Sequence, residues 1–131
     1  MTTTPDLVID TDILIDVGRG IPEAIIYVHD KEQQYRLLVS TITVLELMIG
    51  ARNKTELRKI ERFLQRFVVV KTNEAIADRA TDLIRQYRFS HGLLLADAFV
   101  AATALTQRIP LASKNQRDYQ FISDLLLLPY P

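Results

Sequence analysis

Short apolar runs alternate with longer amphipathic segments along this 131-residue chain. The short runs are β-leaning or simply apolar, and they predict strands at residues 7–10, 36–40, 67–70, 111–113 and 125–128. The segments between them are long enough to form helices. Strands that alternate with helices favour a mainly parallel sheet with helices on both faces. The pattern therefore predicts an α/β fold with a central sheet of about five strands.

Helix signals occur between these runs. Pro22 suits a first helical turn, Asn73 suits an N-cap, and the apolar residues of 55–66 recur at spacings of three and four. A first helix is expected to begin near Thr11. The other predicted helices span residues 22–34, 43–51, 55–66, 73–87 and 94–107.

Composition narrows the class of protein. Hydrophobic residues make up 48% and charged residues 24% of the chain, as in an ordinary globular protein, and the length fits one domain over residues 1–131. The absence of cysteine excludes disulfides and thiol nucleophiles, and two histidines argue against a histidine-rich metal cage. No apolar stretch approaches the ~20 residues that span a bilayer, and the N-terminus lacks a signal-peptide pattern. We expect a cytoplasmic protein without a membrane partner.

Three carboxylates, Asp10, Glu46 and Asp97, stand inside apolar runs. An ionised carboxylate in a dry interior costs several kcal/mol. Two of them ~4 Å apart repel by roughly 4 kcal/mol at an effective dielectric near 20. A divalent cation removes this difficulty, because hard cations prefer oxygen ligands and reverse the local electrostatic sign. We therefore expect the three acids to converge on a metal-dependent hydrolytic site.

Each acid also has a simpler interpretation. Asp10 can serve as the N-cap of the helix that begins near Thr11. Asp12 either supports the metal or binds water. Glu46 is flanked by apolar residues on nearly every side of a short helix, and the alternative is partial exposure. Asp97 either caps a helix beginning at Ala98 or points into a polar cleft, which we favour because the helical pattern extends upstream.

Residues 113–119 follow the fourth predicted strand and offer hydroxyl, amide and carboxylate groups. In an open parallel sheet, functional groups gather at the carboxyl ends of the strands. This segment is therefore placed to complete the site. The alternative is a polar turn in which Asn115 caps a short helix.

Residues 52–66 carry six basic side chains against two acids, although the whole chain has a formal net charge of zero. Such a segment can contact phosphates. The alternative is a solvated helix face with intrahelical ion pairs such as Glu56 with Lys59.

Four motifs together resemble those of the PIN-domain nucleases. They are residues 8–14, 44–50, 96–104 and 112–119, which occur in order and cover nearly the whole chain. The compact length resembles the VapC toxins of prokaryotic toxin–antitoxin pairs. Ser113 stands where the family commonly has threonine, and Asn115 stands where some members have an acid.

The resemblance implies an endoribonuclease that depends on Mg²⁺ or Mn²⁺ and cleaves RNA with a metal-activated water. It also implies a small VapB-like antitoxin, whose segment occupies the cleft, and a homodimer. The implied metal ligands are Asp10, Glu46 and Asp97. The fourth position falls to Asp118, as a further catalytic acid, or to Asn115. The implied supporting residues are Asp12, Ser113 and Asn115.

Two rival functions remain open. In a phosphatase of the haloacid dehalogenase type, Asp10 would be the nucleophile and Asp12 the acid/base, although Leu14 stands where that family usually has threonine or valine. In a non-catalytic Rossmann-like interaction module, the acids would be caps and surface groups. Residues 18–20 do not continue as a dinucleotide fingerprint, so nucleotide binding has little support.

Overall fold

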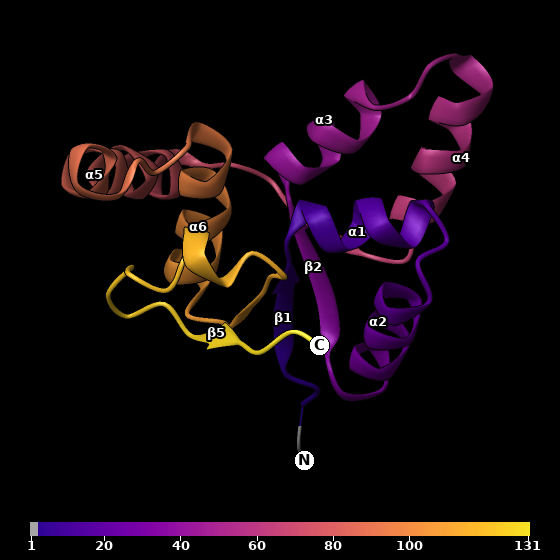
Figure 1. Ribbon diagram of the computed structural model, residues 1–131, viewed down its shortest axis with the longest axis horizontal. Coiled ribbons are helices and arrows are strands. Elements are labelled where there is room, and N and C mark those ends of the chain that lie inside the picture. Colours follow the sequence, from indigo (N-terminus) through magenta and orange to yellow (C-terminus); the bar gives the residue numbers. More distant parts are fainter. Residues whose placement is uncertain (1–2) are drawn as a thin grey trace.

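Five short strands form one sheet in the computed structural model, which describes residues 3–131 (Figure 1). The strand order is β3-β2-β1-β4-β5, and every neighbouring pair is parallel. The strands are β1 (Asp6–Ile9), β2 (Arg36–Ser40), β3 (Val68–Val70), β4 (Leu111–Ala112) and β5 (Leu127–Leu128). The α/β fold and the parallel sheet are confirmed. Residues 1 and 2 of the predicted 1–131 domain lie outside the described residues.

The helices occupy the predicted segments with shifted ends. They are α1 (Thr11–Gly18), α2 (Pro22–Gln34), α3 (Thr41–Ile49), α4 (Lys54–Leu64), α5 (Glu74–His91) and α6 (Leu95–Gln107), with a 3₁₀ helix η1 at Gln116–Asp118. Helix α3 begins two residues early because the Ser40 side chain caps it. Helix α5 continues to His91, since the first residue to adopt a left-handed conformation is Gly92, with a φ of 68°.

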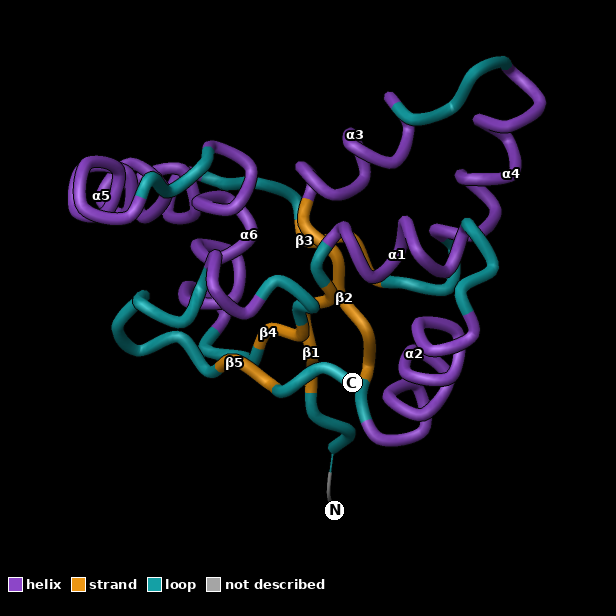
Figure 2. Tube along the Cα trace, viewed as in Figure 1, coloured by secondary structure: helices purple, strands orange, loops and turns teal. Residues whose placement is uncertain are grey.

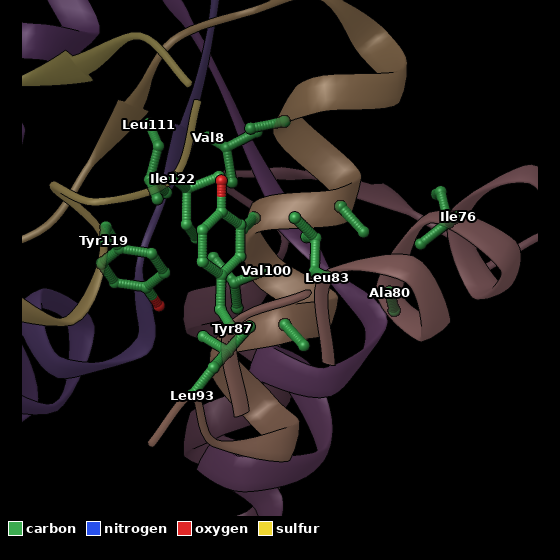
Figure 3. Close-up of a cluster of buried hydrophobic side chains, with 14 of the residues drawn as sticks. Val8, Ile76, Ala80, Leu83, Tyr87, Leu93, Val100, Leu111, Tyr119 and Ile122 are labelled. Atoms are coloured by element: carbon green, nitrogen blue, oxygen red, sulfur yellow. The ribbon is translucent and has the colours of Figure 1, made fainter. Parts of the chain in front are cut away.

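Helices cover both faces of the sheet. Val8 and its register partner Leu111 pack with α5 and α6 on one face (Figure 3). Leu38, the partner of Val8 on β2, belongs to the same cluster. Leu7 and Ile9 pack with α1 and α2 on the other. This alternation follows from strand geometry, because successive side chains point to opposite faces. No helix in residues 3–131 combines the length and the apolar character needed to cross a bilayer.

The strand order reverses beside β1, which lies between β2 and β4. In Figure 2, α1 and α3 both start at the upper ends of β1 and β2. These are the carboxyl ends of the strands, where open parallel sheets bind ligands at the point of reversal. Asp10 follows β1 and Ser113 follows β4 at this point. The fold thus brings two of the predicted site segments to the same crevice.

Candidate active site

Asp10 is the N-cap of α1 and is only 4% exposed. Its Oδ1 accepts a 2.8 Å hydrogen bond from the Thr11 backbone N–H, and its Oδ2 accepts a 2.8 Å hydrogen bond from the Ser113 hydroxyl. Burial is the main cause that raises the pKa of Asp10 to about 7, and the charges of Asp97 and Asp12 also raise it. The two hydrogen bonds act in the opposite direction and lower the pKa. Asp10 therefore caps the helix and also belongs to an acidic cluster.

Asp97 lies in the first turn of α6 and is half-buried. The Tyr119 hydroxyl donates a 3.0 Å hydrogen bond to its Oδ1. Burial raises the pKa of Asp97 to about 6; the Tyr119 hydrogen bond opposes this rise, and the charges of Asp118, Asp12 and Glu46 add to it. Because α6 starts at Leu95, Asp97 does not cap a helix beginning at Ala98.

Glu46 is exposed, so the expectation of three carboxylates in a dry interior is wrong at this position. Helix α3 buries only Thr43 and Leu47, which stand one turn apart on a narrow stripe. Two of its other apolar residues face solvent, Leu45 at 47% and Ile49 at 82% exposed. Glu46 is therefore exposed although its neighbours in the sequence are apolar.

A chain of hydroxyl groups nevertheless anchors Glu46 to the sheet. Ser40 donates to Thr43 over 3.2 Å, and the Thr43 and Thr11 hydroxyls lie 2.9 Å apart. Thr11 donates to Glu46 Oε1 over 2.8 Å. Since the single hydroxyl proton of Thr11 goes to Glu46, Thr43 must be the donor to Thr11. The hydrogen bonds therefore run in one direction, from the end of β2 to the carboxylate of Glu46.

The segment after β4 contacts the acids from the other side. The Asn115 side-chain amide donates to Asp12, and the Asn115 backbone N–H donates to the Ser113 hydroxyl over 3.0 Å. The Asn115 side chain makes no capping hydrogen bond to η1, so the simple capping alternative is not found. Asp118 is exposed and lies near enough to Asp97 to raise the pKa of that carboxyl.

Four of these acids are each held by a donor from another part of the chain. The donor and acceptor pairs are Ser113 with Asp10, Tyr119 with Asp97, Thr11 with Glu46 and Asn115 with Asp12. Sequence reasoning missed Tyr119, Thr11 and Thr43. A buried tyrosine or threonine is usually a core residue, and no local pattern indicates that its hydroxyl reaches an acid.

The donor chemistry of the cluster suits a hard divalent cation, because it is made of carboxylate, hydroxyl and amide oxygens. The carboxylates of Asp10 and Asp97 have raised pKa values, partly through the charge of neighbouring acids, and a cation would relieve this repulsion. Within residues 3–131, however, no three Asp, Glu or His side chains stand together as a ready metal cage.

A groove of about 890 Å³ opens beside Glu46, between α1, α3 and α4. Its lining is apolar along Leu14, Ile15 and Phe63, and basic side chains that include Arg19 and Lys59 also line it. Glu56, which the alternative interpretation pairs with Lys59, instead forms an ion pair of 2.9 Å with Arg52. Another basic residue of this segment, Arg66, pairs with Glu32.

Comparisons with known proteins identify relatives of this chain. A family model described as PIN domain matches residues 7–122. Ribonuclease VapC10 of Mycobacterium tuberculosis is 36% identical over 83% of this chain and 82% of its own length. Ribonuclease VapC19 of the same species is 33% identical over 89% of this chain and 94% of its own. A toxin–antitoxin complex from Klebsiella pneumoniae contains a chain with a TM-score of 0.78 and 27% identity, covering 94% of this chain and 96% of that one.

Proposed function

Because this chain belongs to the PIN-domain family, we propose that it is an endoribonuclease of the VapC type, a hydrolase that cleaves RNA and depends on Mg²⁺ or Mn²⁺. One observation carries the proposal from the structural side. Asp10 after β1, Glu46 on α3 and Asp97 on α6 gather near the point where the strand order reverses. Burial raises the pKa values of Asp10 and Asp97, and the charges of neighbouring acids raise them further. The two ribonuclease relatives support the same activity.

In this proposal, Asp10, Glu46 and Asp97 hold the metal, and Asp118 stands at the fourth position. When bound, the metal supplies an activated water and offsets charge on the scissile phosphate. The chain's own contribution is to fix the carboxylates before substrate arrives. Ser113 and the Thr11 backbone fix Asp10 through both of its oxygens, while the hydroxyl chain through Thr43 fixes Glu46.

The match of residues 7–122 to the PIN domain argues against the phosphatase alternative. The hydrogen bonds to both oxygens of Asp10 orient the carboxylate and leave each oxygen a second lone pair for a metal ion. The non-catalytic alternative is addressed by the cleavage experiment below.

We also propose a small VapB-like antitoxin as partner, as in the toxin–antitoxin complex to which this chain is similar. The groove beside Glu46 supports this proposal. Apolar side chains and basic side chains together suit an amphipathic segment that carries acidic residues. The cytoplasmic location and the homodimer expected from the sequence stay predictions.

The test is cleavage of total cellular RNA by the purified protein without a partner. One arm contains Mg²⁺ or Mn²⁺ and the other contains a chelator, and the new RNA ends are mapped. We expect cuts at defined positions only when metal is present. A folded protein that binds no Mn²⁺ and leaves the RNA intact would contradict the proposal and favour the non-catalytic interaction module.

A further inference from the structure

Tyr119 is the one tyrosine whose hydroxyl contacts an acid in the described part of the chain. It follows η1 directly and is 1% exposed, within the hydrophobic cluster that includes Val100 and Leu111. In Figure 3 the ring lies at the edge of this cluster, and its oxygen points away from Leu111 and Ile122. The ring is thus packed in the core while its hydroxyl reaches Asp97.

The hydroxyl is the only hydrogen-bond partner of the Asp97 carboxylate within residues 3–131. Asp10, by comparison, is held through both of its oxygens. The orientation of Asp97 therefore depends on one contact. A tyrosine suits this task, because its side chain has few rotatable bonds and close packing fixes the position of its hydroxyl.

We propose that Tyr119 is a positioning residue that holds the Asp97 carboxylate in its place among the other acids. This inference rests on the proposed function, since Asp97 is one of the proposed metal ligands. Tyr119 is assigned no contact with RNA or metal, and it acts through Asp97, which accepts its hydrogen bond. Asp10 also lies near the Tyr119 hydroxyl. Groups that orient the ligands of a metal typically change metal affinity or activity by ~10–100-fold when they are removed.

The chain offers a matched control for a test of this role. Tyr87 belongs to the same hydrophobic cluster and is also buried, but its hydroxyl accepts a 3.2 Å hydrogen bond from the Ser123 backbone N–H. Tyr119→Phe and Tyr87→Phe remove the same atom from the same core. Only the first change removes a contact with an acid.

The experiment measures Mn²⁺ binding to the full-length protein by isothermal titration calorimetry, and RNA cleavage in parallel. Circular dichroism and the melting temperature of the metal-free proteins monitor the fold. We expect Tyr119→Phe to weaken Mn²⁺ binding by about tenfold and to slow cleavage at saturating RNA. Tyr87→Phe should bind Mn²⁺ and cleave RNA as the wild type does.

A double-mutant cycle with Asp97→Asn tests whether Tyr119 acts through Asp97. In the Asp97→Asn background, Tyr119→Phe should cause no further loss of Mn²⁺ affinity. If Tyr119→Phe binds and cleaves like the wild type, or if its effect persists fully in Asp97→Asn, the role of Tyr119 is overturned while the proposed function stands. A wild-type protein that neither binds Mn²⁺ nor cleaves RNA would overturn the proposed function, and this role with it.

Discussion

Ser113 donates a 2.8 Å hydrogen bond to Asp10 although the two residues are 103 positions apart in the chain. The parallel pairing of β1 with β4 creates this contact, because the register that sets Ile9 beside Ala112 also brings together the residues that follow them. The acidic cluster is therefore a consequence of sheet topology. Its remaining members on helices are placed by α1 and α3, which leave the carboxyl ends of β1 and β2, and by α6, which packs against β2 and α3.

The stability of the metal-free protein should fall as the pH rises from about 5 to about 8. Burial raises the pKa of folded Asp10 from 3.8 to about 7, so the folded state binds more protons than the unfolded state in this range. The contribution of Asp10 to stability is complete below its pKa in the unfolded chain and is lost as the pH rises through its pKa in the folded protein. Between about pH 5 and about pH 8 this loss amounts to about 3 kcal/mol.

Asp97 should add a smaller loss of stability, because it is only half-buried and solvent screens its charge. Urea unfolding in the presence of chelator measures the combined effect, and Asp10→Asn should flatten the dependence on pH. A free energy of unfolding that stays constant or rises over this range would show that Asp10 is ionised at little cost in the fold.

Divalent metal should stabilise the folded protein, since an ion that binds only the native state raises the free energy of unfolding by about 2.7 kcal/mol at 100 times its Kd. We expect Mn²⁺ or Mg²⁺ to raise the melting temperature by several degrees at about pH 8. The same titration on Asp10→Asn is the control and should give a much smaller shift. Equal shifts in both proteins would place the bound metal elsewhere.

Thr43→Val should loosen Glu46 while it preserves the shape of the core. Thr43 is fully buried and donates to Thr11, so its loss interrupts the hydroxyl chain and costs about 1–3 kcal/mol. RNA cleavage should fall as well. Thr103→Val is the matched control, because Thr103 is equally buried and donates only to the Phe99 carbonyl of its own helix.

The comparison of the two threonine variants distinguishes a loss of activity at the site from a loss of stability in the core. Chemical unfolding gives the loss of stability, and cleavage of a defined RNA at saturating Mn²⁺ gives the loss of activity. We expect both variants to lose stability but only Thr43→Val to lose activity. Equal activity in both would mean that the orientation of Glu46 does not depend on the hydroxyl chain.

The homodimer expected from the sequence should depend on the apolar surface of α3. Ile49 is 82% exposed and Leu45 is 47% exposed, and α3 packs against α6, whose first residue Leu95 is 66% exposed. Ile49→Glu should therefore shift the protein toward monomer in light scattering after size exclusion, with its circular dichroism unchanged. A wild-type protein that is monomeric at all concentrations would contradict this prediction.

The sequence was a good guide to the fold because the signals for its elements are local. The strand Arg36–Ser40 and the helix Pro22–Gln34 have the predicted limits, since a polar residue or a proline marks their ends. The terminal strand was predicted over 125–128 but is confined to Leu127–Leu128. Asp124 just before it has a φ of 67°, so the chain is still turning there.

The site was less predictable, because its contacts are distant in sequence. Glu46 was expected to be buried from its apolar neighbours, but α3 packs along one stripe and leaves the acid exposed. The cluster depends on Thr43 and Tyr119, whose roles follow from the packing of strands and helices around them. No spacing in the sequence marks a hydroxyl that reaches an acid from another element.

The cleavage rate of Asp97→Asn, measured beside the wild type at saturating Mn²⁺, shows whether the acidic cluster is the active site. Asp78→Asn makes the same chemical change at an exposed position of α5 and serves as the control. We expect Asp97→Asn to lose more than about 100-fold in cleavage rate with its fold intact, because removing a partner outside the ligand shell typically costs only ~10–100-fold. Asp78→Asn should stay fully active. Cleavage by Asp97→Asn at the wild-type rate would contradict the assignment of the acidic cluster as the active site.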